Sequence, residues 1–222
     1  MNGHGVIFDM DGVLVDSYQA HYKSWKQVGE KHGLTMTEEQ FADTFGQTSR
    51  DIIRNLWGDA IPDEEIPEVD REKEAAYRQI IAGDFPEMDG ADDLLKALAE
   101  AGFLIAIGSS GPPENIQVAI DCLPHGRVVS ATVTGEDVTN GKPDPEVFLT
   151  AAKKLGLEPA QCAVVEDAPA GVEAARRGSM AALAITGTAR REELSDRAHI
   201  VVDSLRELDP DKIRSLIDRH AG

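Results

Sequence analysis

The sequence contains few cysteines, few aromatic residues and no long hydrophobic run. Of its 222 residues, 2 are cysteine and 5% are aromatic. Two thiols, Cys122 and Cys162, are too few for a disulfide framework. Cys162 opens an apolar stretch, which predicts a buried and reduced thiol. Reduced thiols favour a cytoplasmic location, and that is our expectation for this chain.

Apolar runs are short throughout the sequence. Residues 103–107 and 180–185 are typical, and both fall well short of the roughly 20 residues that a membrane-spanning helix needs. Residues 1–5 lead directly into a strand-like run. We therefore expect neither a secretory signal nor a membrane partner.

Positive charge is also scarce. The chain has 22 Lys and Arg against 40 Asp and Glu, which gives a formal net charge of −18. Such a chain repels nucleic acids and anionic membrane surfaces, so we expect it to bind neither. A solvated acidic surface explains most of this excess. An anionic substrate would meet the same repulsion, and a few local cations would have to overcome it.

Apolar runs alternate with helical patterns along most of the sequence. The strand-like runs are residues 5–8, 103–108, 128–133, 162–165, 181–185 and, more weakly, 199–202. Helical spacing is clearest over residues 91–101 and 145–155, and each of these segments is followed by a glycine. The alternation predicts an α/β fold with a doubly wound, Rossmann-like parallel sheet, covered by helices on both faces.

Residues 17–84 interrupt this alternation, because no good strand-like run occurs there. The segment predicts four helices, at residues 18–31, from the capping-box sequence at 37–40, at 49–57 and at 63–81. Ser17 is placed to cap the first of them. We therefore expect two domains, an α/β core of residues 1–16 and 85–222 and an inserted helical cap of residues 17–84.

Polar side chains follow four of the predicted strands where each strand ends. They are, in chain order, Asp9, Asp11, Ser109, Lys142, Glu166 and Asp167. Ligands of an open parallel sheet bind beyond the carboxyl ends of its strands. We therefore expect four carboxylates, one lysine and one hydroxyl to meet at one edge of the sheet.

Four carboxylates cannot all ionise in a small space unless a cation neutralises them. Oxygen ligands without a nearby His or Cys suit magnesium better than zinc. A metal ion beside a lysine and a hydroxyl is typical of a phosphate site. A carboxylate can also attack phosphorus, so Asp9 is placed to form an aspartyl-phosphate while Asp11 handles the proton. Gly12 then lets the backbone turn away sharply.

These segments resemble the four motifs of the haloacid dehalogenase superfamily, in the same order and over nearly the whole chain. The matching segments are DMDGVLVDS at residues 9–17, Ser109, GKPDP at residues 141–145 and EDAPAG at residues 166–171. The resemblance implies that Asp9 is the nucleophile and a metal ligand. It implies that Asp11 is the general acid and base and binds the metal through its carbonyl group.

The same resemblance assigns the remaining motif residues. Ser109 and Lys142 would hold the transferring phosphoryl group, with Ser110 and Gly111 beside them. Glu166 and Asp167 would complete the magnesium site.

The helical insertion resembles the branch that contains β-phosphoglucomutase, phosphoglycolate phosphatase and related phosphatases. The similar stretches are residues 16–26, 46–50 and 71–80. The resemblance implies a cap that closes over the site and further substrate-binding residues, namely His21, Gly46, Arg50 and Lys73. Alternatives stay open for two of these residues. His21 lies on an amphipathic helix and could face either the core of the cap or the surface. Lys73 lies in a highly charged helix, where a solvated position is the simpler interpretation.

One segment departs from the mutase pattern. The mutase carries a lysine after its second motif that grips the phosphate that is not transferred. Here residues 110–115 contain no cation, and Glu114 has the wrong sign for such a role. We therefore predict a monomeric, magnesium-dependent phosphatase of a small phosphorylated metabolite, with a sugar phosphate as the expected class.

Two other functions stay open. One is a phosphosugar mutase of the β-phosphoglucomutase type. The other is a phospho-accepting signalling module, but such modules are far shorter and lack both a helical cap and the pair formed by Asp9 and Asp11.

Overall fold

The computed structural model describes residues 3–44 and 47–221, so the predicted substrate-binding residue Gly46 lies outside the described residues. The chain divides into two compact units, one formed by Met1–Asp16 with Phe85–Gly222 and the other by Ser17–Asp84. Each unit has its own hydrophobic core.

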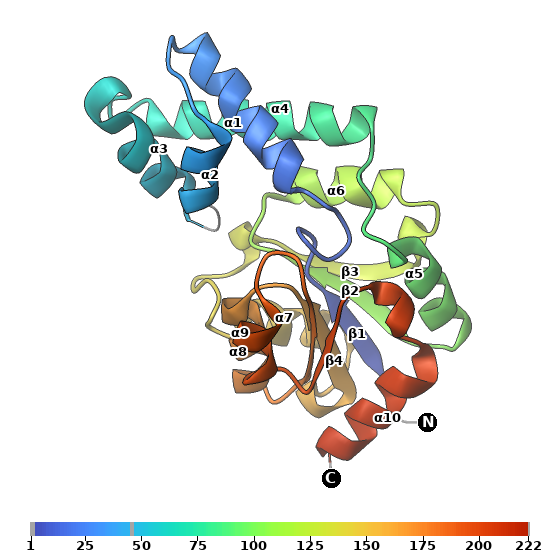
Figure 1. Cartoon of the computed structure of the whole chain (residues 1–222). Helices are drawn as coiled ribbons and strands as arrows, with labels where there is room; N and C mark the ends of the chain where they lie inside the picture. Colours follow the sequence, from blue (N-terminus) through green and yellow to red (C-terminus); the bar gives the residue numbers. More distant parts are fainter. Residues whose placement is uncertain (1–2, 45–46, 222) are drawn as a thin grey trace. The chain divides into compact units, whose positions relative to one another are not determined.

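The larger unit is built on a six-stranded sheet with the order β3-β2-β1-β4-β5-β6. Its strands are β1 (Gly5–Phe8), β2 (Leu104–Gly108), β3 (Val129–Val133), β4 (Cys162–Glu166), β5 (Ala181–Ile185) and β6 (Ile200–Val202). Every neighbouring pair is parallel. The six strands and the doubly wound α/β fold predicted from the sequence are therefore confirmed, and Figure 1 shows β1 between β2 and β4.

Helices cover both faces of this sheet. They are α5 (Ala91–Glu100), α6 (Pro113–Cys122), α7 (Glu146–Leu155), α8 (Pro169–Arg177), α9 (Arg191–Ser195) and α10 (Pro210–Ala221), with short 3-10 turns η2 (Gly126–Val128), η3 (Gly135–Asp137), η4 (Pro159–Gln161) and η5 (Leu205–Glu207). Side chains from α7 and α8, such as Phe148 and Val172, pack with Ile7 and Val164 in one cluster. Because neighbouring residues of a strand point to opposite faces, Val6 and Val165 serve the other face, which α5 and α10 contact.

Both cysteines are free thiols. Cys162 at the start of β4 is fully buried, as predicted, and burial raises the pKa of its thiol to about 12. Within residues 3–44 and 47–221, no helix is both long and apolar enough to span a membrane.

The smaller unit consists of α1 (Tyr18–Lys31), α2 (Glu38–Thr44), α3 (Ser49–Trp57), the 3-10 turn η1 (Gly58–Ala60) and α4 (Ile66–Gly83). Its core contains Trp25 and Trp57, which meet edge to face at 5.8 Å between ring centroids. The buried indole N–H of Trp57 donates to the Thr35 carbonyl at 3.1 Å. The four predicted helices are therefore present, although α4 begins later than predicted, with Pro67 in its first turn.

Two predicted helix caps have different outcomes. The capping box before α2 is confirmed, because the Gln40 N–H donates to Thr37 Oγ1 at 3.2 Å and the Thr37 N–H donates to Gln40 Oε1 at 2.9 Å. The predicted cap at Ser17 is wrong, because its side chain makes no capping bond. Ser17 has helical backbone angles, φ −87° and ψ −8°, whereas a capping residue needs an extended conformation to reach the free N–H groups.

Gly90, at the start of α5, provides a test of the packing in the larger unit. Its φ is +84°, and a Cβ atom there would lie 2.7 Å from Arg206 Cγ and 2.9 Å from the Arg206 nitrogen. Gly102 has a similar φ of +82°, but its Cβ would meet nothing within 4 Å. We expect Gly102→Ala to cost about 1–2 kcal/mol of unfolding free energy, because a non-glycine residue is strained in this conformation.

Gly90→Ala should cost a further ~1–3 kcal/mol, because the added methyl group also overpacks the Arg206 backbone. Urea denaturation of the two variants measures the difference. Equal losses would show that the close contact with Arg206 is not a real constraint.

Candidate active site

The carboxyl ends of β1, β2 and β4 lie side by side at one edge of the sheet. Asp9 follows β1 and continues its ladder, since its N–H donates to the Val165 carbonyl at 2.9 Å. Ser109 follows β2 in the same way, with its N–H donating to the Val133 carbonyl at 3.0 Å. Glu166 ends β4, and Asp167 comes next. The sheet therefore brings together residues that lie far apart in the sequence.

Three carboxylates cluster at this edge. Asp9, Glu166 and Asp167 each offer an oxygen atom, and these atoms lie within 4.8 Å of one another. All three side chains are buried. The donor set consists of carboxylate oxygens alone, which fits a hard divalent cation such as Mg²⁺ better than a transition metal that prefers nitrogen or sulfur.

Lys142 bridges two of these carboxylates. Its Nζ donates to Asp9 Oδ1 and to Glu166 Oε1, both at 2.7 Å, and it lies 4.9 Å from the centre of the Phe148 ring. Burial opposes the charge of Lys142, but the two carboxylates outweigh this effect and hold its pKa above the usual value. Lys142 therefore stays charged inside the site.

One lysine does not neutralise three carboxylates. Burial raises the pKa of Asp9 to about 7, with Lys142 opposing the rise and Glu166 and Asp11 adding to it. Burial also raises the pKa of Asp167 well above its usual value, and repulsion from Glu166 and Asp9 adds to this rise. The protein alone thus leaves the cluster short of positive charge, which a bound cation would supply.

Glu166 is held rigidly by its surroundings. Its Oε2 accepts hydrogen bonds from the N–H groups of Asp167 and Ala168, both at 2.8 Å, while Oε1 accepts from Lys142. Gly171 on α8 packs directly against this side chain, because a Cβ atom there would lie 1.7 Å from Glu166 Oε1. The helix that follows β4 can approach the carboxylate only because residue 171 has no side chain.

Gly12 allows the backbone to approach Asp167 closely, as Gly171 does beside Glu166. Its φ is +72°, and a Cβ atom there would lie 2.0 Å from Asp167 Oδ2. The Gly12 N–H donates to the Val15 carbonyl at 2.8 Å, which closes a tight turn after β1. Asp11, on the same turn, is half-buried and forms a backbone bridge with Val15.

The loop after β2 contains the predicted phosphate-binding hydroxyl. Ser109 is buried, and its Oγ accepts a hydrogen bond from the Gly111 N–H at 3.1 Å, so the hydroxyl hydrogen is able to donate elsewhere. Gly111 is fixed in turn, because its carbonyl accepts from the Gly135 N–H at 3.2 Å. Ser110, between them, is exposed.

In the smaller unit, His21 and Lys73 lie together. Lys73 Nζ is 3.0 Å from His21 Nδ1 and donates to Glu74 Oε1 at 2.6 Å. The His21 ring stacks on Tyr77 with 4.2 Å between centroids. Since an ammonium group can only donate, Nδ1 is the acceptor, and the proton of a neutral His21 is on Nε2. Lys73 is only 4% exposed, so the alternative of a solvated position is wrong.

Arg50 is placed differently. It pairs with Asp63 of the same unit, with 3.1 Å between Nη1 and Oδ1, and both side chains are exposed. Arg54 contacts the same carboxylate. A phosphate group would therefore have to compete with Asp63 for the guanidinium group of Arg50.

Two residues near the carboxylates were missed by sequence reasoning. They are Phe148, whose ring lies under the Lys142 ammonium group, and Thr188, whose Oγ1 borders Gly12 together with the Asp167 carboxylate. Thr188 follows β5, so extending the strand-end argument to the run at 181–185 would have identified it. Nothing in the sequence around Phe148 distinguishes it from an ordinary core residue.

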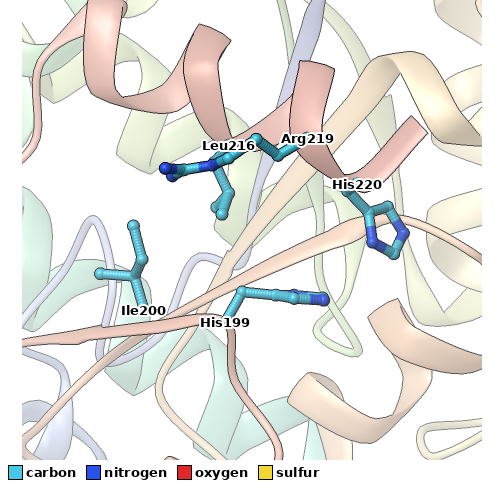
Figure 2. A pocket seen from close by; sticks show the side chains of 5 residues that line it. All are labelled: His199, Ile200, Leu216, Arg219 and His220. Carbon is cyan, nitrogen blue, oxygen red and sulfur yellow. The ribbon is translucent and has the colours of Figure 1, made fainter. Parts of the chain in front are cut away.

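A separate pocket of about 370 Å³ is lined by His199, Ile200, Leu216, Arg219 and His220 (Figure 2). His199 precedes β6 and accepts a hydrogen bond on Nδ1 from the Ala182 N–H at 2.9 Å. The pocket therefore lies at the amino ends of the strands, opposite the carboxylate cluster, and none of the predicted site residues lines it.

Comparison with known proteins gives a consistent result. The profile of the haloacid dehalogenase-like hydrolase family matches residues 4–178. Hexitol phosphatase A of Escherichia coli (strain K12) is 34% identical over 212 residues, which cover 94% of each chain. Validoxylamine A 7'-phosphate phosphatase of Streptomyces hygroscopicus subsp. limoneus is 31% identical and covers 91% of this chain and 94% of that protein.

A relative of another kind is the β-phosphoglucomutase of Bacillus subtilis (strain 168). It is 30% identical and covers 81% of this chain and 82% of that protein. Among solved structures, β-phosphoglucomutase from Clostridium difficile superposes with a TM-score of 0.81 at 24% identity and covers 98% of each chain. This second likeness supports the fold.

The charge balance of the cluster predicts a response to divalent cations. Saturating Mg²⁺, about 100-fold above its dissociation constant, should stabilise the protein by about 2.7 kcal/mol. In the absence of metal, Asp167→Asn should have a higher melting temperature than the parent protein, because the repulsion between Asp167 and the other two carboxylates is removed. Its melting temperature should also rise less when Mg²⁺ is added. Thermal melts with and without Mg²⁺ measure both effects. Asp121→Asn, the same change on the exposed end of α6, should leave the response intact, and a matching loss there would contradict this assignment.

Gly171 provides a second test of the cluster. Gly171→Ala should displace the Glu166 carboxylate and break its bond to Lys142, which we expect to weaken Mg²⁺ binding by about 10- to 100-fold, as changes in support of a metal ligand do. Gly178→Ala is the matched control, because its Cβ would lie at an ordinary 3.4 Å from its neighbours just beyond α8. Mg²⁺ titrations of both variants decide the point. Unchanged affinity in Gly171→Ala would show that Glu166 is not held as described.

Proposed function

The chain belongs to the haloacid dehalogenase-like hydrolase family, and from this premise we propose that it is a magnesium-dependent phosphatase of a small phosphorylated metabolite. The position of Asp9 at the end of β1 is the main support for this activity. Its carboxylate is buried beside Glu166 and Asp167 and held by Lys142 at 2.7 Å.

In this proposal Asp9 is the nucleophile. One of its carboxylate oxygens attacks phosphorus, the bond between phosphorus and the ester oxygen breaks, and Asp11 gives its proton to the departing alcohol. The aspartyl-phosphate on Asp9 is then attacked at phosphorus by water, whose proton passes to Asp11. Inorganic phosphate leaves, and both carboxyl groups return to their starting states.

Lys142 and Ser109 bind the transferring group. An ammonium group has three N–H donors, and those of Lys142 that bond Asp9 and Glu166 leave one for a phosphoryl oxygen. The Ser109 hydroxyl donates a second hydrogen bond, and the backbone of Ser110 and Gly111 lies next to it. When bound, Mg²⁺ would be held by Asp9, Glu166, Asp167 and the Asp11 carbonyl, and it would neutralise charge on the phosphoryl oxygens.

The residues proposed to bind the rest of the substrate lie in the smaller unit. Lys73 bonds His21 and Glu74 and keeps one N–H donor, and its burial beside Trp25 and Tyr77 would strengthen an interaction with an anion. Arg50 would act after exchanging Asp63 for a phosphate group. Gly46 stays a prediction from the sequence, as do the cytoplasmic location and the monomeric state.

A sugar phosphate is the proposed substrate class. The names of two relatives, a hexitol phosphatase and a validoxylamine A 7'-phosphate phosphatase, support it. A mutase is the second candidate, because the Bacillus subtilis relative carries that name. The absence of a cation from residues 110–115 favours the phosphatase, since a mutase has to hold a phosphate at each end of a bisphosphate.

The test is turnover on a panel of phosphorylated sugars and small acids with Mg²⁺. We expect release of inorganic phosphate, and we expect Asp9→Asn to lower it by about 10⁴-fold or more, the usual scale for loss of a nucleophile. A second assay follows conversion of β-glucose 1-phosphate to glucose 6-phosphate with a bisphosphate primer.

Isomerisation without phosphate release would establish the mutase instead. Near-parental turnover by a folded Asp9→Asn variant, checked by circular dichroism, would remove Asp9 from the role of nucleophile.

A further inference from the structure

The aromatic ring of Phe148, in the first turn of α7, lies against the ammonium group of Lys142, with 4.9 Å between Nζ and the ring centroid. Phe148 is fully buried, and the Lys142 side chain is only 11% exposed. A cation within about 6 Å of the centroid of an aromatic ring is attracted by the electrons of the ring face, and the attraction is strongest where water is excluded. The contact between Lys142 and Phe148 therefore belongs to the stronger kind.

The ammonium group of Lys142 is held by three different elements. Asp9, which follows β1, and Glu166, at the end of β4, each accept a hydrogen bond from Nζ at 2.7 Å. The ring of Phe148 adds a contact from α7 that uses no carboxylate and no hydrogen-bond acceptor. Of the three N–H donors of an ammonium group, one is then left for a phosphoryl oxygen. Three contacts from three elements leave Nζ little freedom to move, so they also determine where that donor lies.

The ring of Phe148 is itself fixed by close packing against the sheet. A Cβ atom on Gly108, the last residue of β2, would lie 3.2 Å from Cδ1 and 3.4 Å from Cε1 of the ring. The same Cβ atom would lie 3.4 Å from Ile7 Cγ2 of β1, which belongs to the same core cluster as Phe148. Gly108 directly precedes Ser109, the hydroxyl proposed to bind the phosphoryl group. The ring therefore contacts both Lys142 and the strand that carries Ser109.

The loop that carries Lys142 is tied to the same turn of α7. Glu146 Oε1 accepts a hydrogen bond from the Thr139 N–H at 3.0 Å, and Glu146 Oε2 accepts one from the Asn140 N–H at 2.8 Å. Glu146 thus anchors the backbone just before Lys142. Phe148, two residues further along the helix, contacts the end of the lysine side chain. One turn of α7 therefore supports both the backbone and the ammonium group of this loop.

We propose that Phe148 is a positioning residue, whose ring face holds the ammonium group of Lys142 where it binds the transferring phosphoryl group. The inference rests on the proposed function, since it takes Lys142 as a group that binds phosphate. It gives a second role to a residue that otherwise fills the core, because an aliphatic side chain could occupy the same space without attracting a cation.

The test changes the electrons of the ring and leaves its shape nearly unchanged. Phenylalanine analogues with one, two or three fluorine atoms on the ring are incorporated at position 148 of the full chain. Each fluorine withdraws electron density from the ring face and weakens its attraction for a cation, because the attraction is electrostatic. The dissociation constant of inorganic phosphate is measured by calorimetry in the presence of Mg²⁺. We expect it to rise with each added fluorine, by about 10-fold over the series.

Phe103 provides the matched control. It is buried, and its ring lies 5.0 Å from the Arg214 guanidinium carbon, but it precedes β2 and so lies at the opposite edge of the sheet from the carboxylates. The same analogues at position 103 should leave phosphate affinity unchanged. Equal affinity throughout the series at position 148 overturns the inference, and so does a matching loss at position 103. A lower melting temperature at position 148 with unchanged phosphate affinity also overturns it, because the ring is then only structural.

Turnover of the substrate panel separates this inference from the proposed function. If the parent hydrolyses a phosphorylated substrate and the series at position 148 leaves phosphate affinity unchanged, only the inference fails. If the parent hydrolyses nothing in the panel and the series still weakens phosphate binding, the proposed function fails and the role of Phe148 stands. A parent that binds no inorganic phosphate in the presence of Mg²⁺ would overturn both.

Discussion

The repulsion among three buried carboxylates is the constraint on which the rest of the site depends. Asp9, Glu166 and Asp167 come from two neighbouring strands, and their oxygens lie within 4.8 Å of one another. Lys142 offsets part of this repulsion by contacting two of them at once. Such an arrangement costs folding free energy unless it is compensated. In the proposed function a bound cation supplies this compensation, and Lys142 and the cation together offset the repulsion that an anionic substrate meets in a chain whose net charge is −18.

Close packing around the carboxylates is the second requirement. Gly12 and Gly171 allow the backbone to approach Asp167 and Glu166 to distances that any side chain would prevent. The parallel strand order then places these contacts at one edge, because β1 lies directly between β2 and β4. The contacts of Lys142, the two glycines and the strand order therefore all favour the same arrangement of the three carboxylates. Such agreement between local and long-range features is expected of a sequence that specifies a single structure.

The sequence predicted the fold well, because every strand is a short and largely apolar run, with β1, β4 and β5 buried throughout, and because most of the predicted site residues stand at strand ends. The residues at the ends of β1, β2 and β4 and in the loop after β3 could be listed from that rule alone. Other features depend on contacts between distant segments. Ser17 has the right side chain for a cap but the wrong backbone angles. The burial of Lys73 depends on the aromatic rings of Trp25 in α1 and Tyr77 in α4. The position of Thr188 near Asp167 depends on the pairing of β5 with β4.

The division of the chain into two units has a consequence for protein engineering. All the groups proposed to make and break bonds to phosphorus belong to the unit formed by residues 1–16 and 85–222, whereas His21, Arg50 and Lys73 belong to residues 17–84. Only two peptide linkages, after Asp16 and after Asp84, join these sets. On the proposed assignment of roles, chimeras that exchange residues 17–84 among relatives should change which substrate is preferred, while the reaction at phosphorus stays that of the host protein.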